Sequence, residues 1–221
     1  MRPFVLESSG LRLEVPGTAD IPAIVEACSD PDVVRFTTVP TPYHRGDAEF
    51  FLSQIVDFGW STGREYTWGV REPGSSLLLG MVSLRLRAHD IGFWLAPQAR
   101  GRGLMSRAVT LVADWAFTEG GLPDVLWEGY VGNDGSAAVA RRAGFTYTGV
   151  GPGLHPGRDG GRPSCWKARL LSTDDRTPRA GWPASSESPE YDAAGGVDLH
   201  GTSTNDAHPD RLERSDHPEE P

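Results

Sequence analysis

The sequence has few cysteines, a single lysine and no long apolar run. Cys28 and Cys165 are too few and too isolated for a disulfide framework or a thiolate metal site, and the histidines lack the spacing of metal ligands. No segment approaches the roughly 18 apolar residues of a membrane-spanning helix, and the N-terminal stretch lacks the apolar core of a secretory signal. These absences predict a soluble, cytoplasmic protein with no metal and no membrane partner.

Acidic charge is concentrated toward the C-terminal end. The 221 residues carry a formal net charge of −9, of which residues 172–221 contribute −8 and residues 1–171 only −1. A nearly neutral body gives no basis for nonspecific binding to nucleic acid, so no nucleic-acid partner is expected. Residues 172–221 are also rich in Pro, Ser and Gly, and their few large apolar residues cannot offset the entropy of ordering. We predict one domain over residues 1–171 and a disordered acidic tail over residues 172–221.

The first 171 residues alternate between strand-like and helix-like patterns. Turn signals between the early strands indicate antiparallel neighbours, and one helix between two strands indicates a parallel crossover. The predicted class is therefore α+β with a mainly antiparallel sheet. Strands are expected at residues 11–15, 66–71, 77–86, 91–95 and 124–131, followed by two more before residue 172. Helices are expected near residues 47–58, 104–118 and 133–143, the first with Phe50, Phe51, Ile55 and Phe58 as its apolar stripe.

The stretch "PQARGRGLMSRAV", residues 97–109, joins a strand to an amphipathic helix. Free amides and the positive end of the dipole at a helix N-terminus favour an anion, and glycines allow a phosphate to approach the backbone closely. Gly-Leu-Met follows the glycines, where an ATP-binding loop needs Gly-Lys-Ser or Gly-Lys-Thr, and the third glycine of a dinucleotide site is missing. On these residues alone, a phosphate-binding loop and a simple Arg-Gly helix cap both remain open.

The segments around this loop resemble a known family. "IGFWLAPQARGRGLMSRAVTLVADWAF", "NDGSAAVARRAGF", "PYHRGDAEFFL" and "SCWKARLL" are similar to segments of the RimJ/RimL branch of the GNAT superfamily, the ribosomal-protein N-terminal acetyltransferases and their relatives. The likeness covers about residues 11–171. It implies the acyl-CoA N-acyltransferase fold, a mixed and mainly antiparallel twisted sheet flanked by helices, with a V-shaped split between strands 4 and 5.

The resemblance also implies acetyl-CoA as cosubstrate. Its pantetheine arm is expected along the backbone of the fourth strand and its pyrophosphate on the amides of the glycine loop, with an Asn at the start of the next helix contacting the arm. The implied cofactor-binding residues are Phe93, Trp94, Leu95, Gln98, Arg100, Gly101, Arg102, Gly103, Leu104, Met105, Asn133 and Ser136.

Three residues are candidates for the acetyl-transfer chemistry. Attack of an amine on the thioester needs a base and a proton for the departing thiolate. Asp90 and Glu128 are the carboxylates near the implied split, and the hydroxyl of Ser136 is the candidate proton donor, with Tyr130 a weaker one. Asn and Ser are also the preferred helix caps, so a structural role remains open for Ser136. Leu126 stands where relatives commonly have Glu, which indicates a different base or acceptor.

The resulting functional prediction is an N-acetyltransferase that acetylates a primary amine, either a protein N-terminus or a small molecule, by direct attack in a ternary complex. The alternative is a non-catalytic acyl-CoA-binding module whose tail docks a partner. Whether the protein is a monomer or a homodimer stays open. Tyr43, His44, Trp60 and His155 are the candidates for lining the acceptor site.

Overall fold

The computed structural model describes residues 2–183. The chain divides into two units, Met1–Ser188 and Pro189–Pro221, and every described residue belongs to the first. The predicted tail beyond residue 183 lies outside the described residues.

The domain is built on one eight-stranded sheet in the order β1-β2-β3-β4-β5-β6-β8-β7. Every neighbouring pair is antiparallel except β5 and β6, as predicted. The sequence analysis missed β1, so the split predicted between the fourth and fifth strands falls between β5 and β6. The strands are β1 (Leu6–Ser8), β2 (Leu11–Glu14), β3 (Glu65–Arg71), β4 (Gly80–Arg85), β5 (Asp90–Leu95), β6 (Asp124–Tyr130), β7 (Thr146–Pro152) and β8 (Ser164–Leu171).

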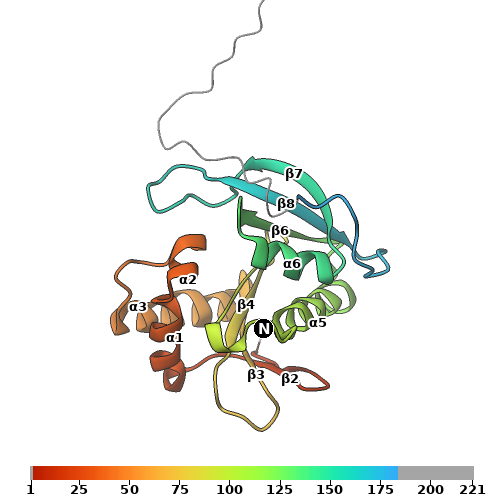
Figure 1. Cartoon of the computed structure of the whole chain (residues 1–221). Coiled ribbons are helices and arrows are strands. Elements are labelled where there is room, and N and C mark those ends of the chain that lie inside the picture. The colour runs from red at the N-terminus through yellow and green to blue at the C-terminus, as the bar shows by residue number, and fades with distance from the viewer. Residues whose placement is uncertain (1, 184–221) are drawn as a thin grey trace, which may run out of the picture. The chain divides into compact units, whose positions relative to one another are not determined.

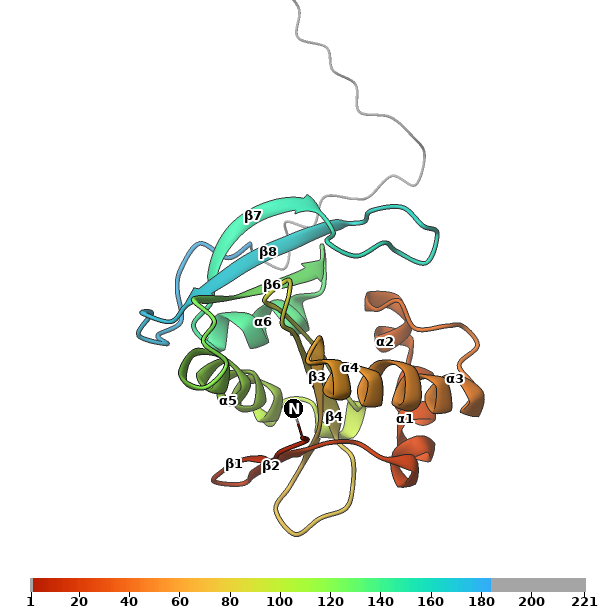
Figure 2. The same cartoon turned by 180° about the vertical axis from the view of Figure 1, so that it is seen from behind.

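Helices cover both faces of this sheet. In the two opposite views, α1–α4 lie on one side and α5 and α6 on the other (Figures 1 and 2). The apolar side of α5 is buried against the sheet, as its spacing predicts. The helices are α1 (Ile21–Cys28), α2 (Pro31–Phe36), α3 (Arg45–Phe50), a π-helical segment (Phe51–Asp57), α4 (Phe58–Thr62), α5 (Leu104–Thr118) and α6 (Asp134–Arg142), with 3-10 turns at Thr18–Asp20 and Pro97–Ala99.

The apolar stripe predicted for residues 47–58 is wrong. Phe50, Ile55 and Phe58 are exposed, and the buried positions are instead Ala48, Leu52, Val56 and Trp60. The physical reason is the π-helical segment between α3 and α4, whose wider turns bring positions four residues apart onto one side.

The parallel strands β5 and β6 separate soon after they begin. Their pairing consists of Asp90 with Leu126 and Ile91 with Trp127. On its other edge β5 stays paired with β4 up to Leu95. The edge of β5 that faces β6 beyond Ile91 therefore has no strand partner within the described residues, which is the predicted split.

The described residues after β8 lie against the domain, whereas the sequence predicts disorder from residue 172 onward. Arg176 pairs with Asp114 at 2.8 Å, and the Trp182 ring lies 5.6 Å from that of Trp127. A cation and a large aromatic ring supply these contacts in an otherwise polar segment. The domain boundary after Leu171 stays a prediction.

Candidate active site

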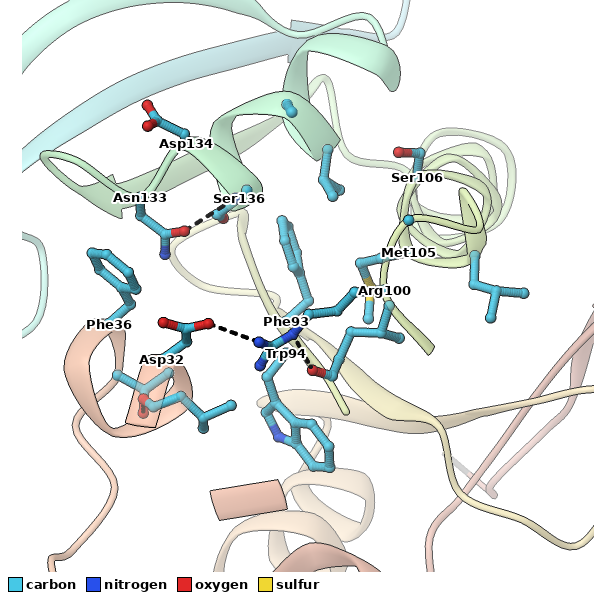
Figure 3. Close-up of a pocket in the computed structure, with 18 of the residues that line it drawn as sticks. Asp32, Phe36, Phe93, Trp94, Arg100, Met105, Ser106, Asn133, Asp134 and Ser136 are labelled. Atoms are coloured by element: carbon cyan, nitrogen blue, oxygen red, sulfur yellow. Dashed lines mark hydrogen bonds and ion pairs between the residues drawn. The ribbon is translucent and has the colours of Figure 1, made fainter. Parts of the chain in front are cut away.

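A cavity of about 480 Å³ opens beside the split. Its walls come from α2, the end of β5, the glycine loop, the start of α5 and the start of α6 (Figure 3). Among the predicted cofactor residues, Gln98 and Arg102 lie outside its lining. Those that line it are Phe93, Trp94, Leu95, Arg100, Gly101, Gly103, Leu104, Met105, Asn133 and Ser136.

The glycine loop presents bare backbone to this cavity. Gly101 and Gly103 have φ of +76° and +70°, in the left-handed region that favours glycine, and a Cβ at either would meet open space. Gly103 is the N-cap of α5 and offers no side-chain cap. The first-turn amides of α5 and its positive dipole end therefore have no competing side-chain partner at this cap.

The arginines of the loop are held by carboxylates. Arg100 contacts Asp30 and Asp32 at 2.5 and 2.8 Å, so it joins the loop to α2, and Arg102 pairs with Glu72. Burial favours the protonated form of Asp30, but the Arg100 hydrogen bond, the Val33 amide and the charge of Arg100 together outweigh it, and the pKa is lowered. The backbone amides, more than these paired guanidinium groups, are thus available to an anion.

Arg142 is a cavity residue that the sequence analysis missed. It lies in the last turn of α6 and lines the cavity, and within residues 2–183 its guanidinium has no ion-pair partner. The signal was present in the sequence, because an amphipathic helix that ends in two arginines places a cation on its exposed side. Only the packing of α6 beside α5 shows that this cation faces the cavity.

Asn133 and Ser136 are joined at the start of α6. The Asn133 side chain caps the helix by accepting the Ser136 amide at 3.1 Å, as predicted (Figure 3). The hydroxyl oxygen of Ser136 accepts a separate hydrogen bond from the indole nitrogen of Trp127 at 3.1 Å. Because Trp127 can only donate, the hydroxyl proton of Ser136 stays free to point elsewhere.

Asp90 lies outside the cavity lining and is held in a polar cluster. Its side chain is 1% exposed, accepts from Arg85 Nε at 2.8 Å and lies 3.2 Å from His155 Nε2. Cross-strand pairing places Glu65, Arg85 and Asp90 side by side on three strands. Burial raises the pKa of Glu65, against the attraction of Arg85. Glu65, Arg85, Asp90 and His155 are referred to as the polar cluster.

Glu128 also lies outside the cavity lining. Its carboxylate accepts the amide of Leu154 at 2.8 Å and pairs with Lys167 at 3.1 Å. Side chains two residues apart on a strand share a face, so Glu128 projects to the same face of the sheet as Leu126. Cross-strand partners also share a face, and the partner of Leu126 is Asp90. Glu128 therefore fastens the loop between β7 and β8 that carries His155.

The predicted acceptor residues are separated by the fold. Trp60 and Tyr43 are buried, and Trp60 stacks on Tyr66 at 4.4 Å within an aromatic core. His44 is the N-cap of α3. Of the four candidates, only His155 lies beside another predicted site residue, Asp90.

Residues 2–183 contain neither a membrane-spanning helix nor a cluster of metal ligands. No helix there combines the length and apolar character needed to cross a bilayer. No group of three or more His, Cys, Asp or Glu side chains in that range is arranged to hold a metal ion.

Comparison with known proteins gives a family match. A model described as the acetyltransferase (GNAT) domain matches residues 11–146. YjcK of Bacillus subtilis strain 168, described as a probable N-acetyltransferase, is 35% identical over 92 residues, which are 39% of this chain and 51% of YjcK. YdaF of the same strain, provisionally described as a ribosomal N-acetyltransferase, is 37% identical over 73 residues, 31% of this chain and 40% of YdaF. The chain thus spans about half or less of these curated relatives.

Solved structures share the fold. A protein from Vibrio cholerae, provisionally described as a ribosomal-protein-serine acetyltransferase, superimposes with a TM-score of 0.69 at 20% identity, over 77% of this chain and 99% of that one. RimL, the ribosomal L7/L12 alpha-N-protein acetyltransferase in complex with coenzyme A, gives 0.65 at 17%, over 76% and 98%. MccE, the microcin C7 self-immunity acetyltransferase with acetyl-CoA and AMP, gives 0.63 at 17%, over 74% and 93%. These matches confirm the predicted fold class.

Proposed function

The chain belongs to the acetyltransferase (GNAT) domain family, as its motifs predicted, and from this premise we propose that it acetylates a primary amine with acetyl-CoA as the donor. The observation that carries the proposal is the cavity itself. It joins an unpaired strand edge, a glycine loop with positive φ and an uncapped helix N-terminus in one continuous wall. A donor with an extended amide-bearing arm and a diphosphate group requires these three features.

The anionic end of acetyl-CoA fits the start of α5. The bare backbone at Gly101 and Gly103 leaves room for phosphate oxygens, and the first-turn amides of α5 are ready to donate to them. Arg142 adds a charge that no carboxylate of the described residues neutralises. Arg100 acts indirectly, because it pairs with Asp30 and Asp32 and so holds α2 against the loop.

The extended arm of acetyl-CoA fits the free edge of β5. Backbone groups at Phe93 and the N–H of Leu95 have no strand partner toward β6, so an amide-bearing chain can hydrogen-bond there in the manner of an added strand. The carbonyl of Leu95 already accepts a hydrogen bond from Arg100 Nε at 3.3 Å. The arm then runs past Asn133 at the start of α6. Side chains of Phe93, Trp94 and Met105 supply apolar wall.

The chain's own groups supply the remaining chemistry. Acetyl-CoA, when bound, provides an acetyl thioester for attack by the amine nitrogen. Ser136 holds a hydroxyl proton at the cavity wall, free because Trp127 donates to its oxygen, and is assigned to protonate the departing thiolate. Asp90 and Glu128 are each engaged by basic groups, Arg85 and Lys167, which favours supporting roles for both carboxylates.

The acceptor is a primary amine of a class that the relatives' names suggest. RimL is described as an alpha-N-protein acetyltransferase of ribosomal L7/L12, and MccE as a microcin C7 self-immunity acetyltransferase. Both are compatible with this fold, because the loops that recognise an acceptor vary independently of the donor site. A protein N-terminus is the first acceptor to test, and small amines the second.

A thiol-release assay tests the proposal. The purified chain is mixed with acetyl-CoA and, separately, with peptides beginning in Ser or Ala, with spermidine and with an aminoglycoside, and acetylated product is identified by mass spectrometry. Amine-dependent release of thiol supports an acetyltransferase. Binding of acetyl-CoA by calorimetry without turnover on any acceptor favours the non-catalytic acyl-CoA-binding module, and absence of binding contradicts both.

A further inference from the structure

We propose that His155 accepts the proton that the acceptor amine loses, and that Asp90 is the positioning residue that holds the imidazole for this task. The inference rests on the proposed acetyl transfer and goes beyond it by assigning the proton acceptor to the loop between β7 and β8. It gives the two sequence-predicted carboxylates, Asp90 and Glu128, supporting roles.

Asp90 is suited to orient a base more than to act as one. Its side chain is 1% exposed, and the Arg85 guanidinium contacts one carboxylate oxygen, Oδ2, through two nitrogens. The same oxygen lies 3.2 Å from His155 Nε2. A buried carboxylate whose Oδ2 contacts both a guanidinium and an imidazole holds the ring in place through Nε2 and leaves Nδ1 as the nitrogen that can take a proton.

The imidazole of His155 is held on one side and open on the other. Nε2 faces Asp90, and Nδ1 has no hydrogen-bond partner within residues 2–183. The His155 side chain is 48% exposed, which leaves Nδ1 accessible to an incoming amine. An imidazole with one nitrogen fixed by a carboxylate and the other free is the arrangement of a general base.

The loop that carries His155 is fastened at both sides of this residue. Glu128 accepts the amide of Leu154, immediately before it, at 2.8 Å. Arg158 donates to the carbonyl of Thr37 at 2.9 Å, and Thr37 lines the cavity. The loop therefore contacts the rim of the cavity. These hydrogen bonds hold His155 in place before any substrate binds.

The polar cluster lies next to the end of the split where the donor's reactive group is expected. Asp90 is in the first of the two residue pairs that join β5 to β6. Gly92, two residues on, has the Arg85 guanidinium over it, since a Cβ there would meet Arg85 Nη2 at 3.2 Å. Phe93 then begins the cavity wall. One buried atom of the cluster, Asp90 Oδ1, also lacks a hydrogen-bond partner, which suits a site completed by a polar ligand.

The amine nitrogen forms a bond to the acetyl carbon, and the carbon–sulfur bond breaks. The proton lost by nitrogen goes to His155 Nδ1, which releases it to solvent. The thiolate takes a proton from Ser136, whose oxygen regains one from solvent. Charged groups facing His155 are Asp90 from β5, Arg85 from β4 and Glu65 from β3, with Glu128 of β6 and Arg158 at the loop's ends.

The positioning role is tested without turnover by NMR of the histidine side chains at one fixed pH. The His155 signal is assigned by its loss in His155→Gln, and its position is compared between the native chain and Asp90→Asn. We expect Asp90→Asn to shift the Nε2 signal, because this nitrogen lies 3.2 Å from the carboxylate that the substitution replaces. An unchanged His155 signal in a variant with a native-like circular dichroism spectrum overturns the positioning role.

The catalytic role is tested by kinetics with whichever amine of the panel is acetylated. We expect His155→Gln to lower kcat/KM about 100-fold or more near neutral pH. Acetyl-CoA affinity, by calorimetry, should stay within about twofold of native. Glu49→Gln, in an exposed ion pair on α3, is the control and should keep native activity. An active native chain whose His155→Gln variant keeps native kcat/KM overturns the inference alone, whereas an inactive native chain overturns the proposed function.

Discussion

The cavity beside α5 and the polar cluster beside it are built in opposite ways. The part of the cavity wall proposed to hold the donor includes one continuous stretch, residues 93–105, which offers backbone amides and apolar surface. The polar cluster joins Glu65, Arg85, Asp90 and His155, which are distant in sequence and contribute charged side chains. A donor common to a large family can be held by backbone geometry, whereas handling one amine depends on side chains that long-range contacts bring together.

Substitution of Gly103 is expected to break the backbone side of this comparison and to have the largest effect. Gly103→Val places a β-branched residue at φ +70° on the cavity wall, where it strains the loop and fills space meant for phosphate. We expect acetyl-CoA affinity by calorimetry to fall about 100-fold or more.

Gly121→Val is the matched control. Gly121 lies just beyond the opposite end of α5, with φ +66° and equally open surroundings. We expect a similar loss of stability, about 1–2 kcal/mol from the strained φ, and native acetyl-CoA affinity. Equal loss of affinity in both variants would show that strain in α5, not a phosphate site, explains the result.

Ser136→Ala sharpens the distinction between binding and chemistry. Removing the hydroxyl should lower kcat by about 100-fold through loss of the proton donor, with acetyl-CoA affinity nearly unchanged. Trp127→Phe removes the same indole–hydroxyl hydrogen bond but keeps the hydroxyl. It should keep most of the activity, and an equal loss in the two variants would assign Ser136 a structural role only.

Arg142→Gln tests whether an unpaired cation matters where paired ones do not. We expect acetyl-CoA affinity to fall about tenfold and to depend less steeply on salt. Arg102→Gln removes a guanidinium that pairs with Glu72 outside the cavity, and it should change the affinity less than about threefold. The reverse order of effects would contradict the assignment of Arg142.

The smallest expected effect is on stability and comes from Glu65. Burial raises the pKa of this carboxyl in the folded chain, so the unfolded chain ionises first and stability is lost as the pH rises from about 4.3 through the folded-state pKa. Glu65→Gln cannot ionise and should raise Tm by roughly 2 °C at pH 7 but not at pH 4. Glu49→Gln, in an exposed pair with Arg45, is the control and should change Tm little at either pH.

More of the residues predicted to bind the donor than of those predicted to line the acceptor site fall around the cavity. Ten of the twelve predicted cofactor residues line the cavity, because a strand, a glycine loop and a helix that follow one another keep their relation in the fold. The exceptions, Gln98 and Arg102, belong to the same loop but turn away from the cavity. Arg142 was missed because its helix reaches the cavity only through packing against α5.

The assignment of residues to the acceptor side depended on pairing between strands. Alternation alone left the direction of the Glu128 side chain undecided, and its contact with Leu154 answers that question. Trp60 and His155 were equal candidates in the sequence, yet the fold places Trp60 in an aromatic core and His155 beside Asp90. Nothing in the sequence near His155 points to Asp90, which precedes it by 65 residues.

The sequence by itself determined the family, through its motifs. It also determined the fold class and the position of the glycine loop, because these follow from local periodicity and from backbone preferences of neighbouring residues. Only the tertiary structure decided which charges are free and which are neutralised. Arg100, Arg102, Asp90 and Glu128 are all ionisable groups near the split, but each meets a partner from a distant segment. The energy of a charge depends on its burial and on the ions around it, and these are set by packing rather than by sequence order.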